Sequence, residues 1–214
     1  MSTGESSRRR PRAARRDAVE NREKVLRTAA DLIAVSGHNV PLTEIADAAG
    51  VGVGTFYRSF PDRAALLEEL QRRGYELLLA TLARIKADGL TGADAIEAYL
   101  QECLTLANQL VAMPLRGAEP LADDAAVEAK ARIGQAINSF LAEGRADGSV
   151  YADVAALDVI VCGTLIALPL PHGPDWEVTA QRHLALFIRG IRKQRGQDSG
   201  ARRKGKPQAT HPAD

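Results

Sequence analysis

The sequence predicts an all-α protein in which a small N-terminal head of three helices precedes a larger helical domain, with about nine helices in total. Two observations lead to this prediction. Residues 42–67 contain two very short helical segments, which a glycine-bearing turn joins and Phe60-Pro61 closes. Past residue 89, apolar residues recur at helical spacing almost to the C-terminus.

The composition is that of an ordinary globular protein of one or two small domains. Of the 214 residues, 45% are hydrophobic and 26% are charged, which is enough apolar material for real cores. No stretch approaches the roughly 18 apolar residues of a membrane span, and the arginine-rich N-terminus contains no apolar run of the signal-peptide kind. We therefore expect a cytoplasmic protein that has no membrane partner.

The first sixteen residues are rich in arginine and poor in apolar side chains. Such a segment cannot fold alone, so we expect a disordered basic arm in the absence of DNA and a first helix over residues 17–36. On DNA the arm would follow phosphates or enter the minor groove, and the alternative is a solubilising tail. Residues 196–214 form a second basic tail, which is also expected to be disordered.

The short helical pair can be placed residue by residue. Thr43 is a suitable N-cap for a helix over residues 44–49, because its hydroxyl can accept a hydrogen bond from a free amide of the first turn. Gly50 follows where a helix end needs a left-handed conformation, and Val51 can fill the angle between the two helices.

The second short helix has two distinct faces. The apolar residues at i, i+3 and i+7 are predicted to point inward: Val53, Phe56 and Phe60. The opposite face then carries Gly54, Thr55 and Arg58. Pro61 ends this helix after about two turns, and Asp62 caps the next one.

The outer face suits a DNA groove. Gly54 permits a close backbone approach, the hydroxyls of Thr55 and Tyr57 can reach phosphates, and Arg58 can bind a guanine edge or a phosphate. Arg63 adds a phosphate contact from the next helix. The alternative is an amphipathic helix pair inside a helical core, with Arg58 as a solvated charge.

Residues 45–60, followed by Asp62-Arg63 and Leu66-Leu67, resemble the DNA-binding domain of the TetR family of transcriptional regulators. The resemblance covers about residues 20–70. It implies an all-helical homodimer that sits on a palindromic operator, usually represses, and lets go when a small molecule enters the second domain. The DNA-contacting positions of the family fall here on Thr43, Val53, Gly54, Thr55, Tyr57, Arg58 and Arg63.

Two positions depart from the pattern of that family. Gly52 stands where a serine or threonine usually caps the recognition helix, so that cap and its possible phosphate contact are lost. Arg63 replaces the usual lysine, which keeps the positive charge.

The rest of the chain divides into helices over about residues 62–87, 93–111, 122–146, 154–168 and 175–193. The helix over residues 154–168 is apolar nearly all round, so it must be buried on more than one side. We therefore expect homodimerisation through the last two helices, about 153–168 and 175–193. The alternative is a buried central helix in a monomer.

The predicted domains are the arm (1–16), the helix-turn-helix DNA-binding domain (17–70), a helical ligand-binding and dimerisation domain (71–195) and the tail (196–214). Charge is distributed unevenly among them. Residues 1–73 carry thirteen Lys/Arg against ten Asp/Glu, residues 74–188 seven against fifteen, and residues 189–214 eight against two. The acidic middle would repel a duplex, so only the ends are expected to meet nucleic acid.

Large or polar side chains of the second domain are the candidates to line a pocket for an unidentified small molecule: Tyr99, Cys103, Met113, Phe140, Thr164, His172 and Trp176. An acidic body would favour a cationic ligand, although net charge says little about a pocket lining. Cys103 and Cys162 lie in apolar helical runs without Cys-x-x-Cys spacing, so we expect reduced core residues, with a disulfide between them as the alternative.

An enzyme is not expected. None of the four histidines is paired at metal-ligand spacing with another histidine, a cysteine or a carboxylate, and the chain has no phosphate loop or nucleophile elbow. No cofactor or metal is therefore expected. The sequence favours a ligand-responsive, homodimeric repressor on double-stranded DNA, and the alternative is an architectural DNA-binding protein that ignores sequence.

Overall fold

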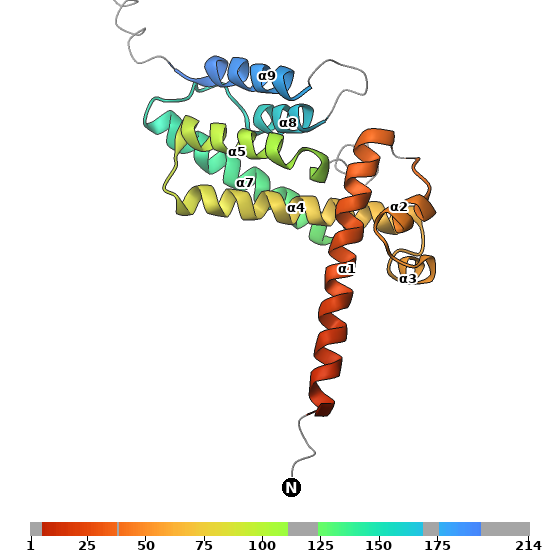
Figure 1. Cartoon of the computed structure of the whole chain (residues 1–214). Coiled ribbons are helices and arrows are strands. Elements are labelled where there is room, and N and C mark those ends of the chain that lie inside the picture. Colours follow the sequence, from red (N-terminus) through yellow and green to blue (C-terminus); the bar gives the residue numbers. More distant parts are fainter. Residues whose placement is uncertain (1–5, 38, 111–123, 169–175, 194–214) are drawn as a thin grey trace, which may run out of the picture.

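The computed structural model describes residues 6–37, 39–110, 124–168 and 176–193, and of residues 6–16 it describes the backbone. Those ranges contain eight α-helices and one short 3-10 helix (Figure 1). The helices are α1 (Ser6–Ser36), α2 (Leu42–Ala48), α3 (Val53–Ser59), α4 (Arg63–Ala87), α5 (Gly92–Leu106), η1 (Ala107–Leu110), α7 (Asp124–Ala146), α8 (Ala156–Ala167) and α9 (Trp176–Ile191). The predicted all-α fold is confirmed.

The head consists of α1, α2, α3 and the first turns of α4. Its core is a cluster of buried side chains from all four helices, among them Leu26, Ile45, Phe56 and Leu66. The N-terminal half of α1 projects well beyond this cluster (Figure 1).

Helix α4 belongs to both parts of the molecule. Leu66 and Leu70 lie in the head cluster, whereas Tyr75, Leu78 and Leu82 lie in a second cluster that forms the core of the body. The change of cluster falls between Leu70 and Tyr75. The sequence predicts this helix as the link between the parts, and the packing agrees.

The body is built around α5, which packs against α4, α7, α8 and α9. The residue after α9, Arg192, contacts both the segment after α7 and the first turns of α5. Val150 pairs with Arg192 in an isolated antiparallel bridge, and the Arg192 guanidinium lies 2.6 Å from a carboxylate oxygen of Asp94 and 2.6 Å from one of Glu97. The C-terminal end of α9 is therefore fixed onto α5.

The structure corrects the start of the first helix. The predicted start is Asp17, after a disordered arm, but α1 begins at Ser6. Residues 1–16 cannot fold alone, but residues 6–16 continue the helix that follows them. Extending an existing helix costs far less than nucleating one, and alanine and arginine are good helix formers.

Three smaller corrections concern helix ends. Thr43 is not an N-cap, because α2 begins at Leu42 with Pro41 in the cap position and no side-chain cap. The helix predicted over residues 93–111 ends at Leu106, since Ala107 has a φ of 27° and starts the 3-10 turn. The helix predicted over residues 154–168 begins at Ala156, with Ala155 as its N-cap. The Asp158 carboxylate accepts a hydrogen bond from the backbone N–H of Ala155 (2.8 Å).

No helix in the described ranges combines the length and the apolar character that a membrane crossing requires.

Candidate nucleic-acid interface and body cavity

The turn between α2 and α3 has the geometry that its glycine predicts. Gly50 has a φ of +64°, a conformation that costs other residues free energy. The N–H of Val51 donates to the carbonyl of Ala46 and the N–H of Gly50 donates to that of Asp47, both over 2.9 Å. These two hydrogen bonds form a Schellman motif, and Val51 packs against the head cluster beneath it.

Helix α3 presents one face to the core and the other to solvent. Phe56 and Phe60 are buried, with their ring centroids 5.5 Å apart, while Gly54, Thr55 and Arg58 are exposed. A Cβ atom built on Gly54 would meet no atom within 4 Å. No atom of the described residues therefore covers α3 at Gly54, and Phe56 and Phe60 pack the opposite side of the helix against the head cluster.

Val53 does not point inward as predicted, since it is 41% exposed. It is the first residue of a seven-residue helix, where the chain is still entering from the turn. This exposed place agrees with the DNA-contacting position that the family resemblance assigns to it. Gly52 precedes it as the N-cap, and no side chain caps α3, as the sequence predicts.

The other predicted DNA-binding residues lie on α2, on α3 and at the start of α4. Thr43 is exposed in the first turn of α2, and Tyr57 is exposed on α3. Arg63 is half-buried at the start of α4, where its guanidinium donates a hydrogen bond to the backbone carbonyl of Val40. Arg63 therefore fixes the start of α4 to the loop before α2, a contact that spans 23 residues and that sequence patterns do not reveal.

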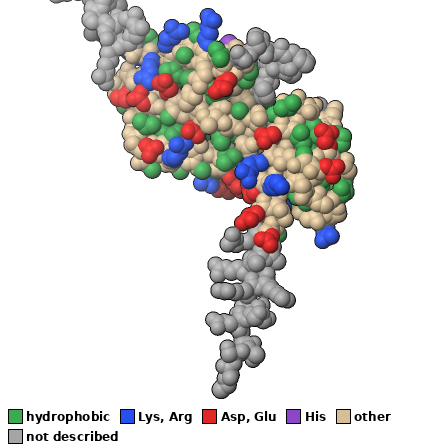
Figure 2. All heavy atoms as spheres, in the orientation of Figure 1, with side chains coloured by type: hydrophobic (Ala, Val, Ile, Leu, Met, Phe, Trp, Pro, Cys, Tyr) green, Lys and Arg blue, Asp and Glu red, His purple; other side chains and the backbone are tan. Residues whose placement is uncertain are grey.

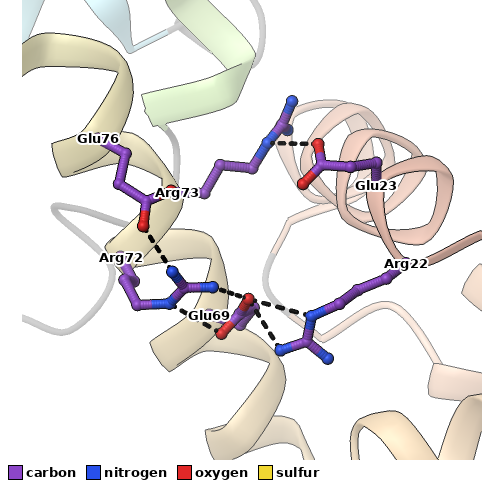
Figure 3. A network of polar contacts seen from close by, with 6 residues as sticks. All are labelled: Arg22, Glu23, Glu69, Arg72, Arg73 and Glu76. Atoms are coloured by element: carbon purple, nitrogen blue, oxygen red, sulfur yellow. Dashed lines mark hydrogen bonds and ion pairs between the residues drawn. The ribbon is translucent and has the colours of Figure 1, made fainter. Parts of the chain in front are cut away.

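Arg22 of α1 contacts Phe60, the residue directly after α3, and pairs with Glu69 of α4. Figure 3 shows the pair with Glu69. The guanidinium carbon of Arg22 lies 4.9 Å from the centre of the Phe60 ring, within cation–π range. Its Nη2 atom lies 2.8 Å from Oε1 of Glu69. Glu69 also accepts hydrogen bonds from Arg72, and Arg72 pairs in turn with Glu76 at 2.5 Å. One carboxylate thus joins α1 and α4 next to the end of α3.

The environment of Glu69 keeps its carboxylate ionised. Burial by itself would raise the pKa of this group, but the hydrogen bonds from Arg72 and Arg22 outweigh burial and hold the pKa below its ordinary value. In Figure 2 acidic and basic side chains gather where α1 leaves the molecule.

A second set of polar contacts reaches from the head into the body. Arg73 of α4 lies 3.2 Å from a carboxylate oxygen of Glu23 in α1, and it donates a hydrogen bond to the Gln109 side chain over 2.6 Å. Gln109 lies in η1 next to Leu110, whose side chain lines a cavity in the body. This 3-10 turn therefore lies between the head and the cavity.

The cavity has a volume of about 220 Å³ and lies among α4, α5, η1, α7 and α8. Five of its lining residues carry a polar or ionisable side chain: Tyr75, Tyr99, Cys103, Lys130 and Thr164. The apolar residues of its wall include Leu78, Leu110, Ile133, Ile160, Ala167 and Leu168.

Burial keeps the inner polar groups uncharged. It raises the pKa of Tyr99 far above its ordinary value, and it raises the pKa of the Cys103 thiol to about 12. The Tyr99 hydroxyl and the Cys103 thiol are hydrogen-bonded to each other. The Thr164 hydroxyl donates to the carbonyl of Ile160 over 2.9 Å.

Three of the predicted ligand-contacting residues line this cavity: Tyr99, Cys103 and Thr164. Phe140 lies in the body core outside the lining, and the indole N–H of Trp176 donates to the carbonyl of Ile166 over 3.2 Å. Met113 and His172 lie outside the described residues. Cys103 is buried and Cys162 half-buried, and both are free thiols.

The cavity is also lined by Lys130, Gly163 and Ala167, which were not predicted from the sequence. Glycine and alanine in a helix carry no signal of a cavity, and a lysine on an amphipathic helix reads as a solvated charge. Within the described residues, no group of three or more His, Cys, Asp or Glu side chains is placed to hold a metal ion.

One outer face of the body is apolar. Helices α8 and α9 lie side by side at one end of the bundle (Figure 1), and each exposes large hydrophobic side chains to solvent. On α8 these residues recur every fourth position: Leu157, Val161 and Leu165. Val178 and Leu186 extend the exposed set on α9. We call these five residues the α8–α9 face.

Known proteins resemble the chain both in its head and over its length. Residues 25–70 match the profile of the bacterial regulatory proteins of the tetR family. A helix-turn-helix-type transcriptional regulator of Staphylococcus aureus (strain USA300) is 30% identical over 91 residues. That match covers 42% of this chain and 49% of the relative, so it spans about half of the relative's length.

Two crystal structures match most of the fold. A TetR transcription regulatory protein from Mycobacterium vanbaalenii is 27% identical, with a TM-score of 0.60 over 84% of this chain and 99% of that one. A TetR transcriptional regulator from Streptomyces coelicolor is 28% identical, with a TM-score of 0.57 over 80% and 98% of the two chains.

The head and its exposed α3 thus place the protein in the class of helix-turn-helix transcriptional regulators. Within that class, the chain belongs to the TetR family. Proteins of this family regulate transcription and are not enzymes.

Proposed function

We propose that this protein is a homodimeric repressor that binds a palindromic operator through α3 and is released from it by a small molecule in the body cavity. The observation that carries the proposal is the outer face of α3, where Gly54, Thr55 and Arg58 are exposed above a buried aromatic pair. Gly54 allows close approach to a groove, and Arg58 is the side chain that reads a guanine edge.

The α8–α9 face supports the dimer. Leu165 of this face is 60% exposed, and large apolar side chains gathered on a surface mark an interaction site. A two-fold dimer also answers a need of the head, because one short recognition helix makes few base contacts. Two copies can reach successive major grooves about 34–36 Å apart.

The cavity and η1 support release by a ligand. Leu110 lines the cavity, and its neighbour Gln109 is bonded to Arg73, which also pairs with α1 of the head. A ligand that binds better to one position of η1 would shift the arrangement of the heads, and a shift of that kind is what allosteric coupling requires. A regulator of bacterial chromosomal DNA would act in the cytoplasm.

The first test is selection of binding sites from a random-sequence DNA library, followed by footprinting. We expect an inverted repeat. Arg58→Ala should weaken binding to the selected site by about 1–3 kcal/mol for each half-site, because a bidentate contact to a base is lost. Lys86→Ala removes an exposed charge at the far end of α4 and is the matched control.

Selection that yields no common sequence, with equal binding by Arg58→Ala, would favour the architectural DNA-binding protein instead. The dimer is tested separately by sedimentation velocity. Leu165→Glu should give monomers, whereas Val127→Glu, at an exposed apolar position on α7, should not. Unchanged sedimentation of Leu165→Glu would contradict dimerisation through this face.

A further inference from the structure

The described lining of the body cavity carries a charge at one position. Among the described residues that line the cavity, Lys130 on α7 is the one that carries a charge, and none is an aspartate or a glutamate. The phenol of Tyr99 and the thiol of Cys103 stay protonated because they are buried. The described part of the wall therefore holds no negative charge that would stabilise a bound cation.

Lys130 is exposed, which places its ammonium group at the solvent side of the cavity. Among the described residues, none forms an ion pair or a hydrogen bond with it. Deeper in, the wall is formed by apolar side chains such as Leu78, Ile133 and Ile160. The described lining is thus uncharged inside and positively charged at one end.

The volume limits the size of the ligand. A cavity of about 150 Å³ accepts benzene, so about 220 Å³ suits a single ring or a short aliphatic chain. The excess of acidic residues in the body does not enter this wall, because none of those residues is among its described lining.

We propose that the cavity binds a small organic acid whose apolar ring or chain fills the interior while its carboxylate pairs with Lys130. The inference rests on the proposed function, since it names the chemical class of the molecule that would release the repressor. It differs from the cationic ligand that the net charge of the body would favour.

The experiment compares three probes of one shape that differ in charge: octanoate, 1-octanol and octylamine. A second series consists of benzoate, benzyl alcohol and benzylamine. Binding to the full-length protein without DNA is measured by isothermal titration calorimetry. In at least one series the acid should bind more tightly than the alcohol, and the amine should bind most weakly.

Variants then assign the preference to one residue. Lys130→Gln should weaken binding of the acid about 2- to 5-fold, the range of a solvent-exposed ion pair, and should leave the alcohol unchanged. Lys130→Glu should reverse the order of acid and amine. Arg132→Gln removes another exposed charge from α7 outside the lining and should change nothing.

Ala167→Leu adds bulk to the wall and should reduce binding of acid and alcohol alike. The proposal is overturned if the amine binds as tightly as the acid, if Lys130→Gln leaves the ratio of acid to alcohol affinity unchanged, or if neither acid binds. Operator binding is assayed on the same preparations. Loss of sequence-specific DNA binding would refute the regulator while leaving the acid preference intact, so the two failures are distinguishable.

Discussion

Replacing Glu69 by glutamine removes the charge that joins α1 to α4 beside the recognition helix. The side chain is 13% exposed and is bonded to both Arg22 and Arg72. A buried hydrogen bond to a charged group contributes about 1.5–3 kcal/mol, and an exposed ion pair about 0.2–1 kcal/mol. Because the arginines are partly exposed, the lower part of this range applies, and we expect a loss of about 1–2 kcal/mol in the free energy of unfolding.

For a chain of this length, each kcal/mol corresponds to about 2–4 °C in Tm, so Glu69→Gln should lower Tm by about 2–8 °C. The matched control is Glu76→Gln on the same helix. Glu76 is 60% exposed and pairs with Arg72, itself 48% exposed, so its loss should cost at most about 0.5 kcal/mol.

The assay is thermal unfolding followed by far-UV circular dichroism, with protein concentration held constant because dimerisation would make Tm depend on it. A double-mutant cycle with Arg22→Gln isolates the contact between the two helices, since it separates the ion pair from the contact of Arg22 with Phe60. If Glu69→Gln lowers Tm no more than Glu76→Gln does, the reasoning about Glu69 is refuted.

Three further predictions concern stability. Because the pKa of Glu69 is lowered in the folded protein, the stabilisation by its carboxylate is full above about pH 4.5 and is lost as pH falls through the folded-state pKa. The difference in urea midpoint between wild type and Glu69→Gln should therefore be constant from pH 8 to 5 and should shrink below pH 5. Gly144→Ala should destabilise by about 1–3 kcal/mol, because the new methyl group would lie 2.5 Å from Cγ2 of Val150, whereas Gly134→Ala on the same helix meets open space and should stabilise by about 0.5–1 kcal/mol; equal urea midpoints would contradict this. Asp62→Ala should cost about 1 kcal/mol in urea unfolding, because the carboxylate accepts from the N–H of Ala65 (2.8 Å), and Asp62→Asn should restore most of it.

Local features of the head could be predicted because they depend on neighbouring residues. The left-handed Gly50, the uncapped Gly52 and the Asp62 cap each follow from the few residues around them. Thr43 failed as a cap because the cap depends on where the helix starts, and Pro41 already provides the extended backbone at that point. The prediction that Val53 points inward was wrong, because helical periodicity does not show where a short helix leaves the core.

The features that require tertiary contacts were not predictable from one sequence. Arg63 reaches the carbonyl of Val40, and Arg22 reaches Glu69 across 47 residues. The cavity wall likewise comes from five secondary-structure elements, so the sequence around Lys130 does not reveal that this residue lines it. Periodicity shows which side of a helix is apolar, but it does not show what packs against that side.

Helix α3 has no side-chain cap at its N-terminal end, and it is attached to α1 directly after its C-terminal end. Phe60, directly after α3, packs under the Arg22 guanidinium, and Arg22 is bonded to Glu69 of α4. About one and a half to two and a half turns further along, α4 contributes Tyr75 and Leu78 to the cavity wall. Because α4 is one continuous helix, a displacement of its cavity side would reach Glu69 and, through Arg22, the end of α3. The orientation of α3 therefore depends on the contact at its C-terminal end as well as on the turn before it.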